Sequence, residues 1–274
     1  MWLLAVMMAL SSPVRALEVT VTSHPPLPAA NLLANADIEQ GPNGQPASWR
    51  WGTATPENFV TGWADNGRSG KCLYLKSLSP VMSGYWNQTV KVKPQTEYML
   101  TGWFRLNGGK LLCYVNSRTA DQRTLDERFY AVSMRNSPLV PVFLKPEYTK
   151  GYVEVERWHP FRIPFTPVEK MEWVSVSAGM YFQAGEVWYD DFRLLPAKTE
   201  LKLQVKAGDE GLGRVRVLAK GVEQPVFDSG PLAGGTNSFE KTLPGLSTEA
   251  QYLIEATDSA GAKQVKAYPE EVAR

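Results

Sequence analysis

The sequence predicts an all-β protein, in which a jelly-roll β-sandwich is followed by a second, smaller immunoglobulin-like β-sandwich. From residue 31 onward no window sustains an apolar repeat of three to four residues, whereas apolar and polar residues alternate between clusters of Gly, Pro and Asn. The composition changes at residues 195–198, because all nine Trp precede them and the remainder is rich in Gly, Val and Lys. A chain of 274 residues is also long for one domain and comfortable for two.

The first 16 residues have the pattern of a signal peptide. An apolar run at residues 2–10 is followed by residues 11–16, which end in Val-Arg-Ala, small or permissive residues at the usual cleavage spacing. We therefore expect an exported protein that is secreted, periplasmic or on the cell surface. A short uncleaved anchor is the alternative, because only the amino terminus supplies positive charge before the run.

The charge balance argues against an electrostatic partner. The chain has 29 Lys and Arg against 28 Asp and Glu, and removal of residues 1–16 takes away only Arg15, which leaves a net charge of zero. A nucleic-acid binder usually carries a basic surplus on its binding domain, and here both signs are spread along the chain. We expect no nucleic-acid partner and no membrane span after signal cleavage.

The first domain is expected to span residues 31–197. Residues 17–30, with a Val-Thr alternation and several Pro, are expected to form an extended leader. The candidate strands that follow predict a sandwich or jelly roll of antiparallel strands. They are residues 71–75, 85–93, 97–106, 110–117, 152–155, 159–164, 171–181 and 186–195. Charged residues and Pro blur the pattern between residues 118 and 150, where we expect a short helix or an ordered excursion over the sheet.

The second domain is expected to span residues 198–274. Its candidate strands are residues 200–206, 214–219, 225–228, 238–243, 250–257 and 263–268. The Leu-Pro-Gly-Leu turn at residues 243–246 and the Asp-Ser-Ala-Gly turn at residues 258–261 resemble the late strands of a fibronectin type III domain, in which Tyr252 would be the corner tyrosine. The segment is shorter than most such domains, so another immunoglobulin-like subtype is an alternative.

The two cysteines leave two readings open. Cys72 and Cys113 each lie in an apolar strand-like run. A disulfide suits an exported protein, and two buried free thiols suit the apolar surroundings equally well.

A carboxylate in the last strand of the first domain raises the question of a metal. Alternation in residues 187–194 places Asp190 on one side together with Trp188, Phe192 and Leu194. Burying a lone carboxylate is costly, so it is normally paired, hydrogen-bonded or metal-bound. The stretch expected to open the domain offers Asp37 and Glu39 as co-ligands rather than cations.

Five motifs follow one another in chain order between residues 31 and 195. They are Asn31-Leu32-Leu33-x-Asn35-x-Asp37-Ile38-Glu39, Pro46-x-x-Trp49, Gly67-x-x-Gly70-Lys71-Cys72-Leu73-Tyr74-Leu75, the run from Val90 to Trp103 with Pro94, Thr96 and Tyr98, and Val187-Trp188-Tyr189-Asp190-Asp191-Phe192-x-Leu194. In this order they resemble the carbohydrate-binding modules of the family 4/9/22 type, which are galactose-binding-like jelly rolls. Residues 118–150 depart from that family, since they are longer and more basic than usual.

The resemblance implies a two-sheet sandwich that grips an oligosaccharide or polysaccharide on one concave sheet or its loops, with a structural calcium ion far from the sugar. Carried over, Glu39 and Asp190 would be side-chain calcium ligands, and backbone oxygens near Asp37 and Lys71 would complete the shell. Calcium takes six to eight oxygen ligands, which suits this set.

Sugar recognition combines aromatic faces with amide and charged groups that bond the hydroxyls. In residues 111–117 alternation places Tyr114 and Asn116 opposite a set that is expected to be core, namely Leu111, Cys113 and Val115. The other ligand candidates are Trp63, Tyr85, Trp86, Gln88 and Tyr181. Core packing is the alternative for each aromatic, and we assign Trp49, Trp103 and Trp188 to it.

These observations predict noncatalytic glycan binding, either alone or as an accessory region of a glycoside hydrolase. The chain has two His and none of the common nucleophile or zinc motifs. A glycosidase needs only two carboxylates, so a β-sandwich glycan hydrolase or lyase remains one alternative. A surface adhesion or assembly module that binds protein is the other, and it would show a flat rather than grooved aromatic patch.

Overall fold

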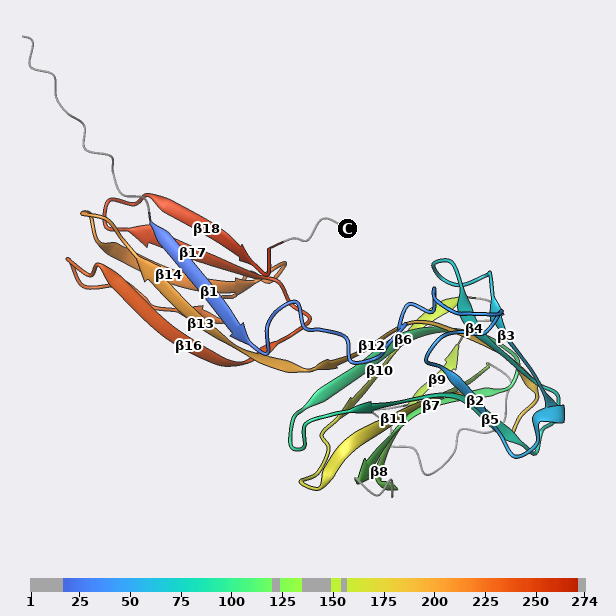
Figure 1. Cartoon of the computed structure of the whole chain (residues 1–274). Helices are drawn as coiled ribbons and strands as arrows, with labels where there is room; N and C mark the ends of the chain where they lie inside the picture. The colour runs from blue at the N-terminus through green and yellow to red at the C-terminus, as the bar shows by residue number, and fades with distance from the viewer. Residues whose placement is uncertain (1–16, 120–123, 135–148, 154–156, 271–274) are drawn as a thin grey trace, which may run out of the picture. The chain divides into compact units, whose positions relative to one another are not determined.

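The computed structural model describes residues 17–119, 124–134, 149–153 and 157–270, with the backbone alone for 124–134 and 149–153. The expected signal peptide therefore lies outside the described residues. The regular elements in these ranges are strands and one 3-10 turn, η1 (Pro56–Asn58), and no helix in them is long and apolar enough to cross a membrane. The strands form two compact units, Ala30–Ala197 and the combination of Met1–Ala29 with Lys198–Arg274 (Figure 1).

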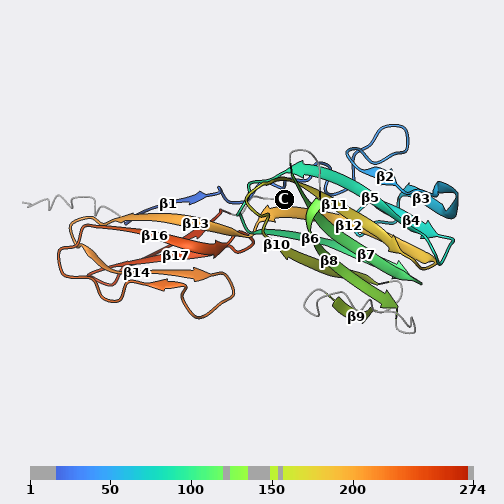
Figure 2. The ribbon, with the colours of Figure 1, turned by 90° about the horizontal axis from the view of Figure 1, so that it is seen from below.

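The Ala30–Ala197 unit is a sandwich of two sheets, which Figure 2 shows from a second direction. The five-stranded sheet has the order β10-β6-β12-β4-β3, and the six-stranded sheet has the order β2-β5-β11-β7-β8-β9. The five-stranded sheet contains β3 (Phe59–Ala64), β4 (Cys72–Ser77), β6 (Tyr98–Asn107), β10 (Trp158–Phe165) and β12 (Gly185–Pro196). The six-stranded sheet contains β2 (Arg50–Gly52), β5 (Ser83–Lys91), β7 (Lys110–Thr119), β8 (Thr124–Met134), β9 (Thr149–Val153) and β11 (Met171–Tyr181).

The core lies between these two sheets, because alternate residues of each strand point inward. Leu100 and Phe104 of β6 face Val174 and Val176 of β11 across it, all without exposed surface. Buried polar groups bond across the core as well: the Trp86 indole N–H donates to the Tyr74 carbonyl at 3.1 Å, and the Tyr189 hydroxyl donates to a main-chain carbonyl at 2.7 Å. The prediction of an all-β sandwich is confirmed.

The eight candidate strands of this unit are all present, with ends shifted by a few residues. Between residues 118 and 150, where we expect a short helix or an ordered excursion over the sheet, residues 124–134 form β8, and β9 pairs parallel with it at the end of the six-stranded sheet. Residues 120–123 and 135–148 lie outside the described residues.

The two ends of this unit lie side by side. Leu32 N–H donates to the Leu194 carbonyl at 3.1 Å, and the Asn31 amide bridges to β12, donating to the Phe192 carbonyl at 2.9 Å and accepting from Leu194 N–H at 2.9 Å. The stretch expected to open the domain therefore does pair with the strand expected to close it.

Strand β12 contains a β-bulge that changes which side its residues face. The register with β6 shifts between Asp190 and Arg193, and Asp191 has a left-handed φ of 51°. Val187 and Tyr189 point into the core before the bulge, and Phe192 points into it after the bulge. Trp188 and Asp190 therefore do not share a face with Phe192 and Leu194, as simple alternation predicted.

The second unit is a smaller β-sandwich with the sheet orders β1-β13-β16 and β15-β14-β17-β18. Its strands are β1 (Glu18–His24), β13 (Lys198–Lys206), β14 (Leu212–Ala219), β15 (Phe227–Asp228), β16 (Ser238–Ser247), β17 (Tyr252–Asp258) and β18 (Lys263–Tyr268). Residues 17–30 were expected to be a leader, but β1 pairs antiparallel with β13 over its whole length and buries Val19 and Val21. The jelly roll is thus inserted between the first and second strands of this sandwich, which explains why residues 198–274 alone looked short.

Two local predictions are settled by burial and geometry. The Tyr252 hydroxyl at the start of β17 donates to the Ser247 carbonyl at 2.8 Å, which is the geometry of a tyrosine corner. Cys72 and Cys113 are both buried free thiols, so the disulfide reading is wrong.

Candidate functional site

The outward face of the six-stranded sheet carries the residues that the sequence singled out on β7. Leu111, Cys113 and Val115 are buried in the core, as expected, so the other side chains of β7 point away from it. We call the surface formed by the outward residues of β2, β5, β11 and β7 the sheet face. Its members are Arg50 and Gly52 of β2; Tyr85, Asn87, Thr89 and Lys91 of β5; Trp173, Ser175, Ser177, Gly179 and Tyr181 of β11; and Lys110, Leu112, Tyr114, Asn116 and Arg118 of β7.

Three tyrosines gather at the centre of this sheet face. Tyr85, Tyr114 and Tyr181 pack around Leu112, which is 4% exposed and belongs to a cluster separate from the main core. The rings of Tyr85 and Tyr114 meet edge to face, with centroids 5.0 Å apart. The three tyrosines themselves are half-buried, so part of each ring faces solvent. This arrangement offers aromatic surface on a rigid apolar base.

A glycine makes room for the tyrosine cluster. In the backbone register Gly179 lies between Tyr85 and Leu112. A Cβ at position 179 would overlap the Gly84 backbone and come within 2.5 Å of the Tyr85 ring, so only glycine lets that ring lie across β11.

Polar groups line the rows next to the tyrosines. Ser177 Oγ donates to Asn87 Oδ1 at 2.6 Å, and Asn87 Nδ2 donates to its neighbouring Tyr85 carbonyl at 2.8 Å. On β7, Asn116 is only 8% exposed, and its Oδ1 has no hydrogen-bond partner among the described residues. The Arg118 Nε is buried and likewise unpartnered in the described part of the chain. Buried polar atoms without partners are rare and costly, which sets these two groups apart from the other polar side chains of the sheet face.

A pocket of about 510 Å³ adjoins the sheet face at the short strand β2. It is lined by Leu32, Ala34, Ser48, Arg50, Asn87, Gln88, Thr89 and Val90. Because Asn87 and Thr89 belong to both the pocket and the sheet face, the two form one continuous surface.

Cations border the tyrosines. Lys110 is 5% exposed, and its Nζ lies 4.4 Å from the centroid of the Tyr181 ring. Burial lowers the pKa of Lys110. Arg50 is exposed at the pocket, on the edge strand β2, which β5 and β11 separate from β7.

Of the predicted ligand residues, Tyr85, Tyr114, Asn116 and Tyr181 come together on the sheet face. Trp86 and Gln88 point to the core side of β5 instead: Trp86 is 2% exposed, and Gln88 is 7% exposed and bonds both the N–H and the carbonyl of Ala34, although it also lines the pocket at β2. Neighbours along a strand face opposite sides, so the cluster of residues 85–88 could not act together.

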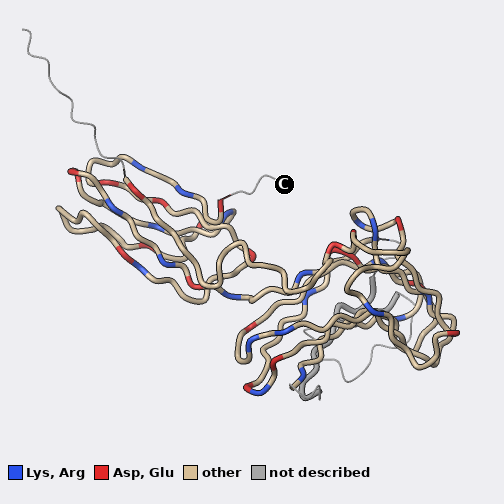
Figure 3. The backbone as a smooth tube through the Cα atoms, in the orientation of Figure 1, with Lys and Arg blue, Asp and Glu red and all other residues tan. Residues whose placement is uncertain are grey.

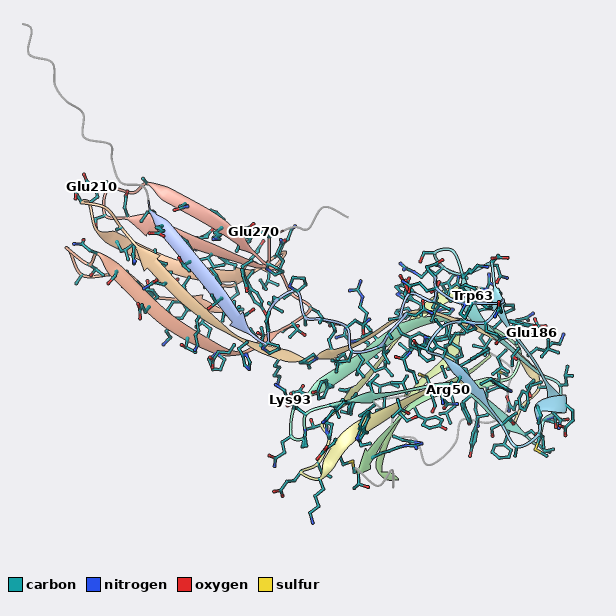
Figure 4. All side chains as sticks on the ribbon, viewed as in Figure 1. Arg50, Trp63, Lys93, Glu186, Glu210 and Glu270 are labelled. Carbon is teal, nitrogen blue, oxygen red and sulfur yellow. The ribbon has the colours of Figure 1, made fainter. Side chains whose placement is uncertain are left out.

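Trp63 lies away from the sheet face, on β3 of the other sheet (Figure 4). It packs against the core, and its indole N–H donates to the Ile38 carbonyl at 2.6 Å. Lys71 covers its ring, with Nζ 4.6 Å from the centroid. Trp63 therefore holds the opening loop in place rather than offering a stacking surface for sugar.

Sequence reasoning missed Trp173, Lys110 and Arg118. Trp173 lies beside Arg118 in the backbone register. The period-two pattern of residues 171–181 and 110–118 would have placed all three on the outward side, had alternation been followed to the strand ends.

The residues predicted to bind calcium form a second cluster, around the turn at residues 67–71. Asp190 is fully buried; its Oδ2 accepts N–H bonds from Arg68 at 2.7 Å and Ser69 at 3.2 Å, and its Oδ1 accepts from Asp191 at 2.7 Å. Glu39 Oε1 accepts from Lys71 N–H at 2.9 Å. Burial raises the pKa of Asp190 to about 6, an effect that the three N–H bonds only partly offset.

The donor set suits calcium. A Cβ on Gly67 would meet the Lys71 carbonyl, Asp190 Oδ2 and the Gly70 carbonyl at 2.7–2.8 Å. Three oxygens therefore converge beside that glycine. The Glu39 carboxylate lies directly against Gly70, in the same turn. Hard oxygen ligands of this kind are those that calcium prefers. Among the described residues no three His, Cys, Asp or Glu side chains converge on one point, and Asp37 makes no contact with this cluster that would add a third carboxylate.

The outward face of the five-stranded sheet carries a row of stacked side chains. This outer row consists of Tyr74, Trp188, Arg105 and Trp158, which are neighbours in the backbone register. The Arg105 guanidinium lies 4.4 Å from the Trp188 ring centroid and 5.3 Å from that of Trp158, and the rings of Tyr74 and Trp188 are 5.3 Å apart. Trp188, which we had assigned to the core, is therefore a surface residue. So is Trp103 in the next row, whose ring lies 4.1 Å from the Arg68 guanidinium.

No protein-family model and no curated protein matches the chain. Several solved structures are similar to about three fifths of it. The enzymatically active domain of bacteriophage CBA120 tailspike protein 4 shares 8% identity with a TM-score of 0.46, over 60% of this chain and 21% of that one. The chain therefore matches about a fifth of the tailspike domain.

Two further similar structures are matched along their whole length. The carbohydrate-binding module TmCBM61, solved with β-1,4-galactotriose, shares 17% identity with a TM-score of 0.42, over 61% of this chain and 99% of that one. A putative sugar binding protein from Bacteroides thetaiotaomicron shares 11% identity with a TM-score of 0.42, over 61% of this chain and all of that one. With TM-scores below 0.5, the functional case has to be made from the residues of the sheet face.

Proposed function

We propose that the protein binds an oligosaccharide or polysaccharide without catalysis, on the sheet face of its jelly roll. The observation that carries the proposal is the tyrosine cluster around Leu112, which presents aromatic surface beside Asn116, whose Oδ1 has no hydrogen-bond partner in the part of the chain that the structure describes. A pyranose ring has an apolar face that stacks on such aromatic surface, and its hydroxyls bond to amides and serines like those in the adjoining rows.

The proposed setting is outside the cytoplasm. The signal-peptide pattern of residues 1–16 supports export, to the medium, the periplasm or the cell surface. The smaller sandwich, which we propose to be of the fibronectin type III kind on the basis of its tyrosine corner, would serve as a spacer. We also propose that a structural calcium ion is held by Glu39, Asp190 and the carbonyls beside Gly67.

The test is binding to a glycan array and to insoluble polysaccharides, with Tyr85, Tyr114 and Tyr181 replaced singly by Ala. Each replacement should weaken binding roughly ten-fold or more, because it removes a stacking partner. Tyr74→Ala is the matched control, since Tyr74 is a half-buried tyrosine on the other sheet, and it should leave affinity unchanged. A protein that binds no glycan in either assay would overturn the proposal.

The outer row favours a second candidate function, an assembly or adhesion module that binds another protein. Trp, Tyr and Arg are the residues most enriched at the energetic hot spots of protein interfaces. In the outer row they are neighbours in the backbone register across four strands. In that case Trp188→Ala would abolish binding to the partner, while the tyrosine variants of the sheet face would retain it.

A further inference from the structure

We propose that the glycan bound on the sheet face is acidic, with carboxylates that contact Arg118, Lys110 and Arg50. The inference rests on the proposed function and names the class of ligand. It starts from the charged positions of the sheet face, which are the basic residues Arg50, Lys91, Lys110 and Arg118. The regularly alternating sheet-face positions on β2, β5, β11 and β7 hold no Asp or Glu, and β11 adds one exposed acid, Glu172, at the register shift opposite Arg118. The next strand adds one acidic position, Glu127, opposite Asn116 in the backbone register.

This local surplus differs from the balance of the whole chain. Lys and Arg nearly equal Asp and Glu in number, and Figure 3 shows both signs distributed over both units. Attraction of a polyanion to the sheet face would therefore come from these few positions rather than from the net charge of the protein.

Lys110 is the first specific argument. A lysine that is 5% exposed normally has a carboxylate or several acceptors nearby, because removing an ammonium group from water is costly. Within the described residues the Lys110 ammonium group lies over the Tyr181 ring. Burial lowers its pKa, and no carboxylate there offsets this effect. A ligand carboxylate beside Tyr181 would supply the missing counter-charge.

Arg118 and Asn116 are the second argument. They lie two residues apart on β7, so they share the same side of the strand. The Arg118 Nε is a buried donor and the Asn116 Oδ1 a buried acceptor, and neither has a partner among the described residues. A guanidinium matches a carboxylate with two parallel hydrogen bonds, and the neighbouring amide oxygen would accept from a sugar hydroxyl.

The pocket at Arg50 is the third argument. Its volume of about 510 Å³ falls within the range of roughly 300–1,000 Å³ that is typical of small-ligand sites. Its polar lining consists of hydroxyls and amides with Arg50 as the charged group, and no carboxylate is among the lining residues. One uronic acid residue would place its hydroxyls and its carboxylate against complementary groups there.

The spacing of the cations favours an acidic oligosaccharide or polysaccharide as the ligand over a single small anion. Lys110 and Arg118 are eight positions apart on one strand, roughly 26 Å, and Arg50 lies three strands from Tyr114, roughly 14 Å. Several consecutive acidic sugars would be needed to reach all of them.

The experiment compares acidic polysaccharides with their own neutral forms. Polygalacturonate and alginate are assayed by isothermal titration calorimetry at 50 and 300 mM NaCl, beside the same polymers after chemical reduction of their carboxyl groups to alcohols. We expect at least one acidic polymer to bind at least ten-fold more tightly than its reduced form at low salt, with affinity falling as salt rises. Arg118→Gln, Arg50→Gln and Lys110→Met should each remove most of that preference.

Lys202→Gln is the matched control, because Lys202 is an exposed cation of β13 in the smaller sandwich. If it lowers the affinity as much as Arg118→Gln does, the attraction is unspecific and the inference is overturned. Equal binding of acidic and reduced polymers, or binding of neutral glycans alone, also overturns it but leaves the proposed glycan binding intact. Failure to bind any glycan, both in these titrations and on the glycan array and insoluble polysaccharides, overturns both.

Discussion

Asp190 is a buried carboxylate that is held by backbone donors rather than by a cation. Its three N–H donors belong to the backbone of Arg68, Ser69 and Asp191, and burial still raises its pKa to about 6 from the ordinary 3.8. The folded protein therefore binds a proton at this residue over a pH range in which the unfolded chain does not.

The first prediction concerns that pH range. Between pH 4 and 6 Asp190 holds more protons in the folded state than in the unfolded state, so its contribution to the free energy of unfolding should fall as pH rises, by about 3 kcal/mol in total, and level off above pH 6. Urea unfolding in the presence of EDTA would measure this slope, and Asp190→Asn should remove it. Asp209→Asn, at an exposed position of the smaller sandwich, should keep it. An identical pH profile for Asp190→Asn and the parent chain would contradict the assignment.

The second prediction concerns calcium at the same residue. An ion bound only by the folded state stabilises it by an amount that depends on occupancy, and a divalent cation beside Asp190 favours the ionised carboxylate. Calcium should therefore raise the melting temperature, EDTA should reverse the rise, and Asp190→Ala should abolish the response. Calcium should also flatten the pH dependence described above. A melting curve that is indifferent to both calcium and EDTA would discard the site.

At the scale of single strands, alternation predicted the structure wherever a strand was regular. It separated Tyr114 and Asn116 from Cys113 and Val115 correctly, because β7 has no irregularity over those residues. It failed on β12, where the bulge at Asp191 inserts a residue and exchanges the two faces. A bulge depends on backbone geometry and leaves little trace in side-chain polarity, so Trp188 was assigned to the wrong side.

Chemical type was a weaker guide than strand position. Trp86 and Gln88 looked like ligand residues because aromatic and amide groups bind sugars, but on β5 they alternate with Tyr85 and so face the core. Conversely, Lys110 and Arg118 were overlooked although the same alternation places them beside Tyr114. The candidate site was therefore predictable to the extent that strand register was.

The third prediction concerns the tyrosine corner of the smaller sandwich. Tyr252 is 2% exposed and its hydroxyl donates to the Ser247 carbonyl at 2.8 Å, so Tyr252→Phe should lower the stability of this unit by about 1 kcal/mol. Chemical denaturation would measure the change. Tyr268→Phe is the matched control: its hydroxyl bonds to Ser23 at 2.8 Å at a more exposed position, and its loss should cost less. A larger loss for Tyr268→Phe would contradict a special role for the corner.

At the scale of the whole molecule, the chain order of the two units differs from their order in space. The smaller sandwich takes its first strand from residues before the jelly roll and the rest from residues after it. Such an insertion is tolerated because the ends of the inserted unit lie together, as the Asn31 bonds to Phe192 and Leu194 show. The sequence predicted two sandwiches but not this arrangement, since nothing local marks β1 as the partner of a strand more than 170 residues away.

The last prediction follows from the split sandwich. A chain that begins at residue 30 lacks β1, so β13 loses its ladder of backbone bonds and the burial of Val19, Val21 and Leu27 is lost. At roughly 1.5–3 kcal/mol for each side chain, the loss is comparable with the total stability of a small domain. In two-dimensional NMR spectra, this chain should show dispersed signals for the jelly roll and collapsed signals for residues 198–270.

A second chain, in which residues 30–197 are replaced by a short Gly-Ser linker, should give a folded small sandwich. Thr199 Oγ1 already donates to the Pro25 carbonyl at 2.9 Å, and the joined ends lie close to that contact. Dispersed signals for residues 198–270 in the first chain would show that β1 adds little, and the domain would then be autonomous after the jelly roll.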